Sequence, residues 1–344
     1  MAKKNKKVTK KKATKKKATK KKAESKASMA PAPVATIPSP KKITSSIYSS
    51  ITNGVSPAFK SNVEKLENSL GAQVWILSEG HLSMDYIVLN NFIRNKSKLP
   101  SKKIVLLLDS FGGQAEPAYL LSRFLQSRCG SFQVVVPRWA KSAATLLALG
   151  AESIILGDEA ELGPLDVQIW DYDNEEKRVS ALDTVQAVEQ LEDSAVRISM
   201  KMLGFLKEKT KKKYNNIMEL SLKFGAELTK PLFEKIDSVA YTRHCRNLHE
   251  AQDYAERLLA HKFNKDEAAA LAKDLVTKYP THGFVIDREE AKSLGVIVDE
   301  KTGESKAPVG LHVIAPPNKD CQEAVEWFRR NMPTGALLGN LVEV

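Results

Sequence analysis

Short apolar runs alternate with helical patterns along much of this chain, and this alternation restricts the fold more than any other feature. The runs share strand length and a lack of polar alternation: QVWIL at 73–77, IVLLL at 104–108, FQVVV at 132–136 and SIIL at 153–156. The segments between them, at 84–94, 116–127 and 143–149, show helical periodicity. Strands that are apolar throughout are typical of sheets covered by helices on both faces. The pattern therefore predicts βαβ units around a mainly parallel sheet.

The remaining segments predict elements outside this alternation. They are an amphipathic helix at 47–70, helices with charged faces at 182–212 and 248–279, a helix end with a last strand at 292–299, a turn-rich segment at 300–320 and a helix at 321–332. In the final helix we expect Trp327 and Phe328 to pack inward. The charged faces indicate that the longer helices pack outside the sheet. Together these segments predict an α/β fold with added outer helices.

The positive charge of the chain lies almost entirely in its first thirty residues. The formal net charge is +12, and residues 1–30 hold 14 Lys and one Glu, or +13, which leaves 12 − 13 = −1 for residues 31–344. Like charges at this density repel, and the KKKAT repeats at 10–23 offer almost no apolar surface to bury. We therefore predict a disordered basic tail and a Pro/Ser linker over 1–46, followed by one folded domain over 47–344.

Two interpretations of the basic tail remain open. Residues 3–26 could bind DNA or RNA, or an anionic lipid surface, through the release of counterions. Alternatively, the tail could keep the protein in solution without a dedicated partner. A folded body with a net charge near zero argues against a domain whose whole surface grips nucleic acid.

Other features of the composition favour a cytoplasmic protein. The three cysteines, Cys129, Cys245 and Cys321, show no paired spacing, which fits a reducing compartment. No apolar run approaches the roughly 18–20 residues of a membrane span, and the basic N-terminus lacks the apolar core of a secretory signal. Cys245 and His249 lie four residues apart, but no further ligand completes a metal site. The absence of a GxGxxG motif likewise predicts no dinucleotide cofactor.

A glycine pair stands directly after the second apolar run, within Asp109-Ser110-Phe111-Gly112-Gly113. Glycines at the end of a strand let the backbone turn sharply and point amide N–H groups outward. Amides placed in this way can hold the negative charge of a developing oxyanion. An ordinary turn between a strand and a helix would also use Gly112 and Gly113, so the motif alone leaves both interpretations open.

A serine stands at the predicted start of a helix within the segment PRWAKSAAT, residues 137–145. Free N–H groups and the helix dipole favour negative charge near Ser142, and the small Ala143 and Ala144 leave room for a substrate backbone. The alternative is that Ser142 only caps the helix. A tight turn, LGPLDVQ at 162–168, follows the next strand and carries Asp166.

In this order, the motifs resemble the serine dehydrogenase proteinase (SDH) family of the Clp-protease/crotonase superfamily. The resemblance extends to YPTHGFVIDREEAKSLGVIVD at 279–299 and covers about residues 70–300. It implies a Clp/crotonase-like spiral of repeated ββα units. It also implies a serine peptidase that acts on a peptide or protein substrate and forms a homo-oligomer. The family name does not imply dehydrogenase chemistry, and the resemblance implies no cofactor and no metal.

The resemblance also implies roles for individual residues. Ser142 matches the nucleophile, and Gly112 and Gly113 match the oxyanion-hole loop, with the Ala143 N–H as a second donor. The Clp subunit carries a His where this chain carries Asp166, and an Asp near the region where this chain carries His282. Because a triad depends on geometry rather than on chain order, we predict His282 as the general base and Asp166 as the carboxylate that orients it.

Several alternatives remain at this point. Lys141 is a rival base, since signal peptide peptidase A pairs a Ser with a Lys, but adjacent side chains point in different directions. Orientation of the site, a substrate contact or a neighbouring subunit's site would also explain Lys141. His282 could be an ordinary surface or core histidine, and Asp166 could cap its turn. Rival functions are a non-catalytic scaffold or peptide-binding regulatory protein, and a crotonase-type acyl-thioester enzyme, for which Ser142 would be superfluous.

Overall fold

The structure is a computed structural model. It describes residues 56–78, 83–97, 99–170, 178–297, 305–332 and 337–340. The predicted basic tail and linker over 1–46 lie outside the described residues, as does the first part of the helix predicted from residue 47. The chain divides into two units, residues 1–40 and 41–344, and all described residues belong to the second.

A six-stranded sheet with the order β10-β1-β2-β3-β5-β9 forms the centre of the fold. Its strands are β1 (Gln73–Ser78), β2 (Ile104–Asp109), β3 (Phe132–Val136), β5 (Ile154–Leu156), β9 (Val313–Ile314) and β10 (Leu337–Asn340). Every pair is parallel except β1 with β10. Each residue of β2 is buried, as expected of a strand covered on both faces. The predicted parallel α/β sheet is confirmed.

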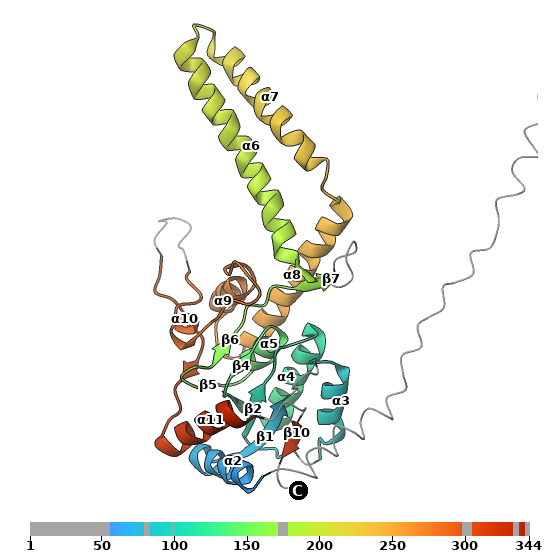
Figure 1. The fold of residues 1–344 in the computed structure, drawn as a ribbon, viewed down its shortest axis with the longest axis vertical. Helices are drawn as coiled ribbons and strands as arrows, with labels where there is room; N and C mark the ends of the chain where they lie inside the picture. Colours follow the sequence, from blue (N-terminus) through green and yellow to red (C-terminus); the bar gives the residue numbers. More distant parts are fainter. Residues whose placement is uncertain are drawn as a thin grey trace, which may run out of the picture. The chain divides into compact units, whose positions relative to one another are not determined.

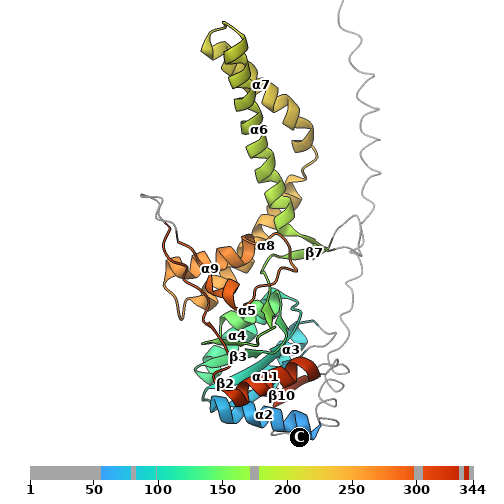
Figure 2. The ribbon, with the colours of Figure 1, turned by 60° about the vertical axis from the view of Figure 1, so that its left-hand side comes forward.

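Helices cover both faces of this sheet. They are α2 (Pro57–Leu70), α3 (Tyr86–Arg94), α4 (Ala115–Cys129), α5 (Ala143–Leu149) and α11 (Lys319–Asn331). Figures 1 and 2 show α2 and α11 side by side. Their seam is aromatic: the Phe59 ring lies 6.0 Å from Trp327 and 5.1 Å from Phe328, edge to face. Phe328 is fully buried, as expected, and Trp327 is partly buried against the core.

A second, shorter ladder of strands follows the ends of the main strands. β4 (Trp139–Ala140) and β6 (Glu161–Leu162) pair in parallel. Single bridges extend the pair to Ser110 on one side and to Ile286 on the other. After each of β2, β3 and β5, the chain enters this second ladder. After β2 and after β3 it then returns to the main sheet through a helix. This strand–strand–helix repeat places three loops next to one another.

Outer helices follow a small antiparallel pair, β7 (Gln168–Trp170) and β8 (Arg178–Ser180). They are α6 (Ala181–Lys209), α7 (Tyr214–Phe233), α8 (Ser238–Leu259), α9 (Lys265–Thr277) and α10 (Arg288–Lys292). Figure 1 shows α6 and α7 as an antiparallel hairpin that extends from the sheet-bearing body. No helix in the described part of the chain combines the length and apolarity of a membrane span.

Three details differ from the sequence predictions. The described residues within 292–299 contain no strand; Gly295 adopts φ +76°, and its N–H donates to Asp274 instead of to a ladder. The helix predicted over 248–279 is two helices, because Asn264 forms a capping box that starts α9. The helix α7 was not predicted.

Candidate active site

Ser142 occupies a strained backbone position between β4 and α5. Its φ is +51° and its ψ is −120°, and it is the one non-glycine residue with positive φ in the described part of the chain. An L-residue adopts this conformation at a cost of order 1–3 kcal/mol. A sharp, strained turn from strand to helix is also the device that presents the nucleophilic serine in other hydrolase folds.

The Ser142 hydroxyl does not cap the helix that it precedes. Ser142 occupies the N-cap position of α5, yet its side chain accepts no capping hydrogen bond. The residue is half-buried, whereas every residue of α5 is buried. The capping interpretation therefore fails, and the hydroxyl stays available at the positive end of the helix dipole.

The glycine bend lies directly against Ser142. Gly112 has φ +97°, and a Cβ on Gly112 would lie 2.5 Å from the Lys141 carbonyl oxygen, 2.9 Å from the Ser142 Cβ and 3.0 Å from the Ala143 nitrogen. Only glycine fits here. Any other residue would place its Cβ too close to these atoms, and L-residues rarely adopt a φ near +97°. The structure thus brings the predicted oxyanion loop and the predicted nucleophile together.

Two backbone amides remain available beside the Ser142 side chain. The Gly112 N–H donates to the Ser110 hydroxyl at 2.9 Å, so it is already engaged. Within the described residues, the N–H groups of Gly113 and Ala143 have no hydrogen-bond partner. The N–H groups of Gly113 and Ala143 are therefore free donors beside Ser142, and the lack of a side chain at Gly112 allows the close approach.

A buried ion pair holds this bend. Arg138 donates from Nε to the Asp109 Oδ1 at 2.9 Å, and a second guanidinium nitrogen contacts Oδ2. Asp109 is 2% exposed and ends β2, while Arg138 precedes β4. A bidentate arginine–carboxylate pair has a defined geometry, so this pair fixes the end of β2 relative to the start of β4.

Asp166 and His282 form a hydrogen-bonded pair. His282 Nδ1 lies 2.7 Å from Asp166 Oδ1. Asp166 is 4% exposed and also accepts from Ser180 Oγ at 2.9 Å and from Gln168 Nε2 at 3.3 Å. Burial of the Asp166 carboxylate raises its pKa. The hydrogen bond and charge of His282, together with the donors Ser180 and Gln168, lower the pKa by more, so the net shift is downward. An ionised carboxylate only accepts, so Nδ1 carries a proton; in the neutral imidazole the lone pair is then on Nε2.

The Asp166 turn is fastened to the Ser142 helix. The Thr145 hydroxyl is buried, lies 2.6 Å from the Ala140 carbonyl oxygen and accepts from the Gly163 N–H at 3.0 Å. A Cβ on Gly163 would lie 3.3 Å from the Ser142 nitrogen. The sequence analysis did not single out Thr145, since a buried threonine in a helix gives no local signal of this contact.

Lys141 is used to hold neighbouring loops. Its Nζ donates to the Leu162 carbonyl at 3.1 Å and to the Phe284 carbonyl at 3.2 Å, and it pairs with Glu161 at 3.1 Å. An ammonium has three donors and no lone pair. With these acceptors in place, Lys141 connects β6 to the loop that carries His282.

An exposed aromatic side chain lies next to the glycine bend. The Phe111 ring stacks on Trp139 with centroids 4.6 Å apart, and Arg138 lies 4.6 Å from the Trp139 ring. Phe111 is 60% exposed. The sequence analysis did not single out the phenylalanine of the DSFGG motif, and only the structure shows that its ring is exposed and lies over Trp139.

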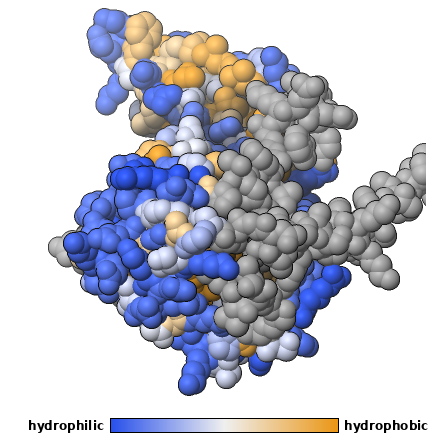
Figure 3. All heavy atoms as spheres, turned by 60° about the horizontal axis from the view of Figure 1, so that its bottom comes forward, coloured by the Kyte–Doolittle hydropathy of each residue, from blue (hydrophilic) through white to orange (hydrophobic). Residues whose placement is uncertain are grey.

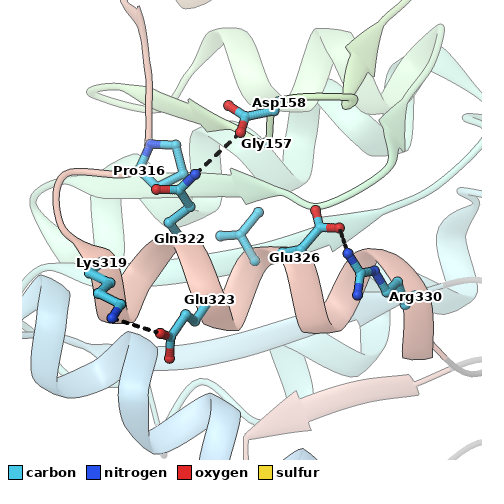
Figure 4. Close-up of a pocket in the computed structure, with 9 residues that line it drawn as sticks. Gly157, Asp158, Pro316, Lys319, Gln322, Glu323, Glu326 and Arg330 are labelled. Atoms are coloured by element: carbon cyan, nitrogen blue, oxygen red, sulfur yellow. Dashed lines mark hydrogen bonds and ion pairs between the residues drawn. The ribbon is translucent and has the colours of Figure 1, made fainter.

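A separate cavity of about 330 Å³ lies between α11 and the loop at Gly157–Asp158. Figure 4 shows polar side chains of this cavity bonded to one another, such as Gln322 to Asp158 and Arg330 to Glu326. It contains none of the predicted site residues. In the part of the chain that the structure covers, no group of three or more His, Cys, Asp or Glu side chains could hold a metal ion.

The parallel sheet, the strand–strand–helix repeat and the serine at a strained helix start define an α/β protein of the Clp/crotonase type. The family model of ClpP-like SDH-type serine proteinases matches residues 88–246. This match confirms the resemblance over that part of the chain. The matched range includes Ser142 and Asp166 but ends before His282.

Curated relatives include two uncharacterised proteins of Methanocaldococcus jannaschii. One is 29% identical over 203 residues, covering 59% of this chain and 56% of its own length. The other is 26% identical over 140 residues, covering 40% and 46% respectively. The chain thus spans about half the length of the curated relatives it matches.

Two solved structures also show similarity. One is the 1510-N membrane-bound stomatin-specific protease in complex with a substrate peptide, with 12% identity, a TM-score of 0.36 and coverage of 76% of this chain and 99% of that one. The other is a ClpP1 mutant from Listeria monocytogenes, with 16% identity, a TM-score of 0.22 and coverage of 46% and 81%.

Proposed function

We propose that this protein is a serine peptidase that hydrolyses peptide bonds through an acyl-enzyme on Ser142. One observation carries the proposal: Ser142 holds a strained positive φ, and its hydroxyl caps nothing while free amides lie beside it. A structural serine would have no reason to sustain that strain. The match to a serine proteinase family supports the same conclusion.

In this proposal, the first half-reaction forms the acyl-enzyme. The Ser142 oxygen attacks the scissile carbonyl carbon while His282 Nε2 removes the hydroxyl proton. The carbonyl π electrons move to oxygen, and the N–H groups of Gly113 and Ala143 stabilise the resulting oxyanion. Asp166 keeps His282 in the required tautomer and stabilises the imidazolium. The imidazolium then donates its proton to the leaving amine as the carbon–nitrogen bond breaks and the carbonyl re-forms, which completes the acyl-enzyme.

The second half-reaction restores the enzyme. Water then attacks the ester carbon, with His282 taking one proton from the water and returning it to the Ser142 oxygen. The products are a free amine and a carboxylic acid, and no metal or cofactor takes part in the proposed steps.

A fluorophosphonate probe tests this proposal, because it reacts with an activated serine. We expect the wild-type protein to be labelled at Ser142, as mapped by peptide mass spectrometry. Ser142→Ala should abolish labelling and peptide hydrolysis, whereas Ser127→Ala, at an exposed serine of α4, should change neither. A folded wild-type protein that is not labelled would support a non-catalytic peptide-binding protein instead.

The basic tail and the assembly state are further parts of the proposal. Residues 1–30 hold 14 Lys, so we infer that residues 3–26 form an electrostatic arm for DNA or RNA. Deletion of residues 1–30 should abolish salt-sensitive binding to duplex DNA; equal binding by the truncated protein would contradict the arm. Homo-oligomer formation and a cytoplasmic location are also inferred from the sequence.

A further inference from the structure

The hairpin of α6 and α7 has small residues where its helices meet. A Cβ on Gly225 would lie 2.1 Å from the Ser199 Oγ and 3.0 Å from the Ala195 carbonyl oxygen. Ser221 and Thr229 are also buried, and each hydroxyl donates to a carbonyl four residues earlier in α7. The two helices therefore approach closely through small side chains, and there is little room for large apolar groups between them.

Many large apolar side chains of the hairpin are exposed. Ten of them are between 41% and 65% exposed: Val196, Met200, Phe205, Tyr214, Met218, Leu220, Leu222, Phe224, Leu228 and Leu232. Figure 3 shows apolar residues gathered on the hairpin, at the top of that view. Four of them are spaced by four in α7, at 220, 224, 228 and 232, which places them along one side of the helix.

The hairpin exposes a large apolar area in total. Summed over the hairpin, ten half-exposed side chains of this size leave on the order of 900 Å² of apolar surface. One partner of a stable protein interface contributes about 800 Å². The area therefore matches what a protein partner would cover.

The charges of the hairpin are separated along its length. Residues 183–193, at its base in α6, carry Asp183, Glu189, Glu192 and Asp193 and no Lys or Arg. Residues 201–213, at its tip, carry six Lys and one Glu. All of these acidic and lysine side chains are exposed. A second hairpin aligned tip to base would place each basic tip against an acidic base.

We propose that the α6–α7 hairpin pairs, tip to base, with the hairpin of a second copy of this chain and forms a four-helix bundle. Two antiparallel helices with an outward apolar surface are half of such a bundle. Tip-to-base pairing is two-fold symmetric, so the same surface serves both copies. With 29 residues, α6 is about 43 Å long, and the two sheet-bearing bodies lie at opposite ends of the bundle.

Light scattering coupled to size-exclusion chromatography tests the apolar contact. The full chain of 38.1 kDa should elute with at least twice that mass. The triple variant Leu220→Gln, Phe224→Gln and Leu228→Gln should shift toward the mass of one chain. The matched control, Glu219→Gln, Lys223→Gln and Glu227→Gln in the same helix, should keep the wild-type mass. A monomeric wild type, or an apolar variant of unchanged mass, would overturn the proposal.

Charge reversal tests the tip-to-base arrangement. One variant carries Lys211→Glu, Lys212→Glu and Lys213→Glu, and the other carries Glu189→Lys, Glu192→Lys and Asp193→Lys. Each variant alone should dissociate at low salt, because like charges then face each other. An equal mixture should form a heterodimer, since both tip–base contacts are again opposite in charge. Failure of the mixture to associate would exclude this arrangement.

The alternative to a second copy on this apolar surface is a lipid bilayer. Co-sedimentation with vesicles of phosphatidylcholine and phosphatidylserine tests it directly. A monomeric wild type that sediments with vesicles, but not after the three apolar substitutions, would replace the proposal. Fluorophosphonate labelling of each variant reports separately on Ser142, so a failure of dimerisation is distinguishable from a failure of the peptidase assignment.

Discussion

The Nδ1 of His282 lies 2.7 Å from the Asp166 Oδ1, although 116 residues separate them in the chain. Asp166 is buried at a turn after β6, and His282 comes from the loop before α10. Thr145 and Lys141 fasten these two loops to the segment that carries Ser142. In the proposed triad, the acid and the imidazole would therefore come from loops in the reverse of the Clp order.

Asp166→Asn should reduce the rate of peptide hydrolysis by about 10³–10⁴-fold. The amide nitrogen of asparagine would donate to Nδ1 and so place the lone pair on the wrong imidazole nitrogen. The measurement is kcat and KM on a fluorogenic peptide, with KM expected to change little. Ser180→Ala, which removes one hydrogen bond to Asp166, should cost much less. Similar losses in both variants would argue for a structural role.

Asp166 should also make the stability of the fold dependent on pH. Its pKa is lowered in the folded protein, so the unfolded chain binds the proton more tightly. The stabilising contribution is therefore present above the ordinary Asp pKa of about 3.9, and it disappears as the pH falls through the lower folded value. Urea unfolding across this window should show a steeper loss for wild type than for Asp166→Asn. Parallel curves would contradict the ionised pair.

Gly112→Ala should abolish hydrolysis and destabilise the protein by about 1–3 kcal/mol. The new Cβ would lie 2.5 Å from the Lys141 carbonyl oxygen, on a residue with φ +97°. Gly204→Ala is the matched control, because a Cβ there meets nothing within 4 Å. In the interior of α6 it should stabilise by about 1 kcal/mol. Thermal unfolding and peptide hydrolysis measure both variants, and an active Gly112→Ala would contradict the close approach.

Much of the central fold could be predicted because its strands are continuous apolar runs. β1, β2, β3 and β5 lie within a residue of the predicted ranges. The helix α7 was missed because most of its large apolar side chains face outward, while Ser221, Gly225 and Thr229 face its neighbour. Its pattern therefore lacks the apolar buried stripe that usually indicates a packed helix.

The sequence analysis named residues of the candidate site, but it could not give the contacts between them. The motifs around Gly112, Ser142 and Asp166 stand at strand ends, where parallel strands bring loops together. The sequence pattern does not show that the Gly112 N–H is already hydrogen-bonded to the Ser110 hydroxyl. This bond leaves the Gly113 N–H as the free donor. Likewise, only packing between distant loops places the Lys141 ammonium on the Phe284 carbonyl.

Ser142→Gly should raise the thermal stability of the protein while removing labelling by fluorophosphonate. Glycine adopts φ near +51° at no steric cost, so about 1 kcal/mol of strain should be recovered. Ser142→Ala keeps the Cβ and should leave the strain in place. Differential scanning calorimetry separates the two variants. Equal melting temperatures would show that the surrounding fold does not force this conformation.

Lys141→Met should lower hydrolysis by positioning rather than by loss of a base. Its ammonium holds the carbonyls of Leu162 and Phe284 and pairs with Glu161. Without it the His282 loop loses an anchor, so kcat should fall about tenfold to a hundredfold, in the range of misplaced catalytic groups. Lys141→Arg should restore part of the rate. Because His282 is the proposed base, the acid limb of the pH–rate profile should keep its midpoint. A Lys141→Met protein without any residual Ser142 labelling, or with a displaced acid limb, would instead identify Lys141 as the base.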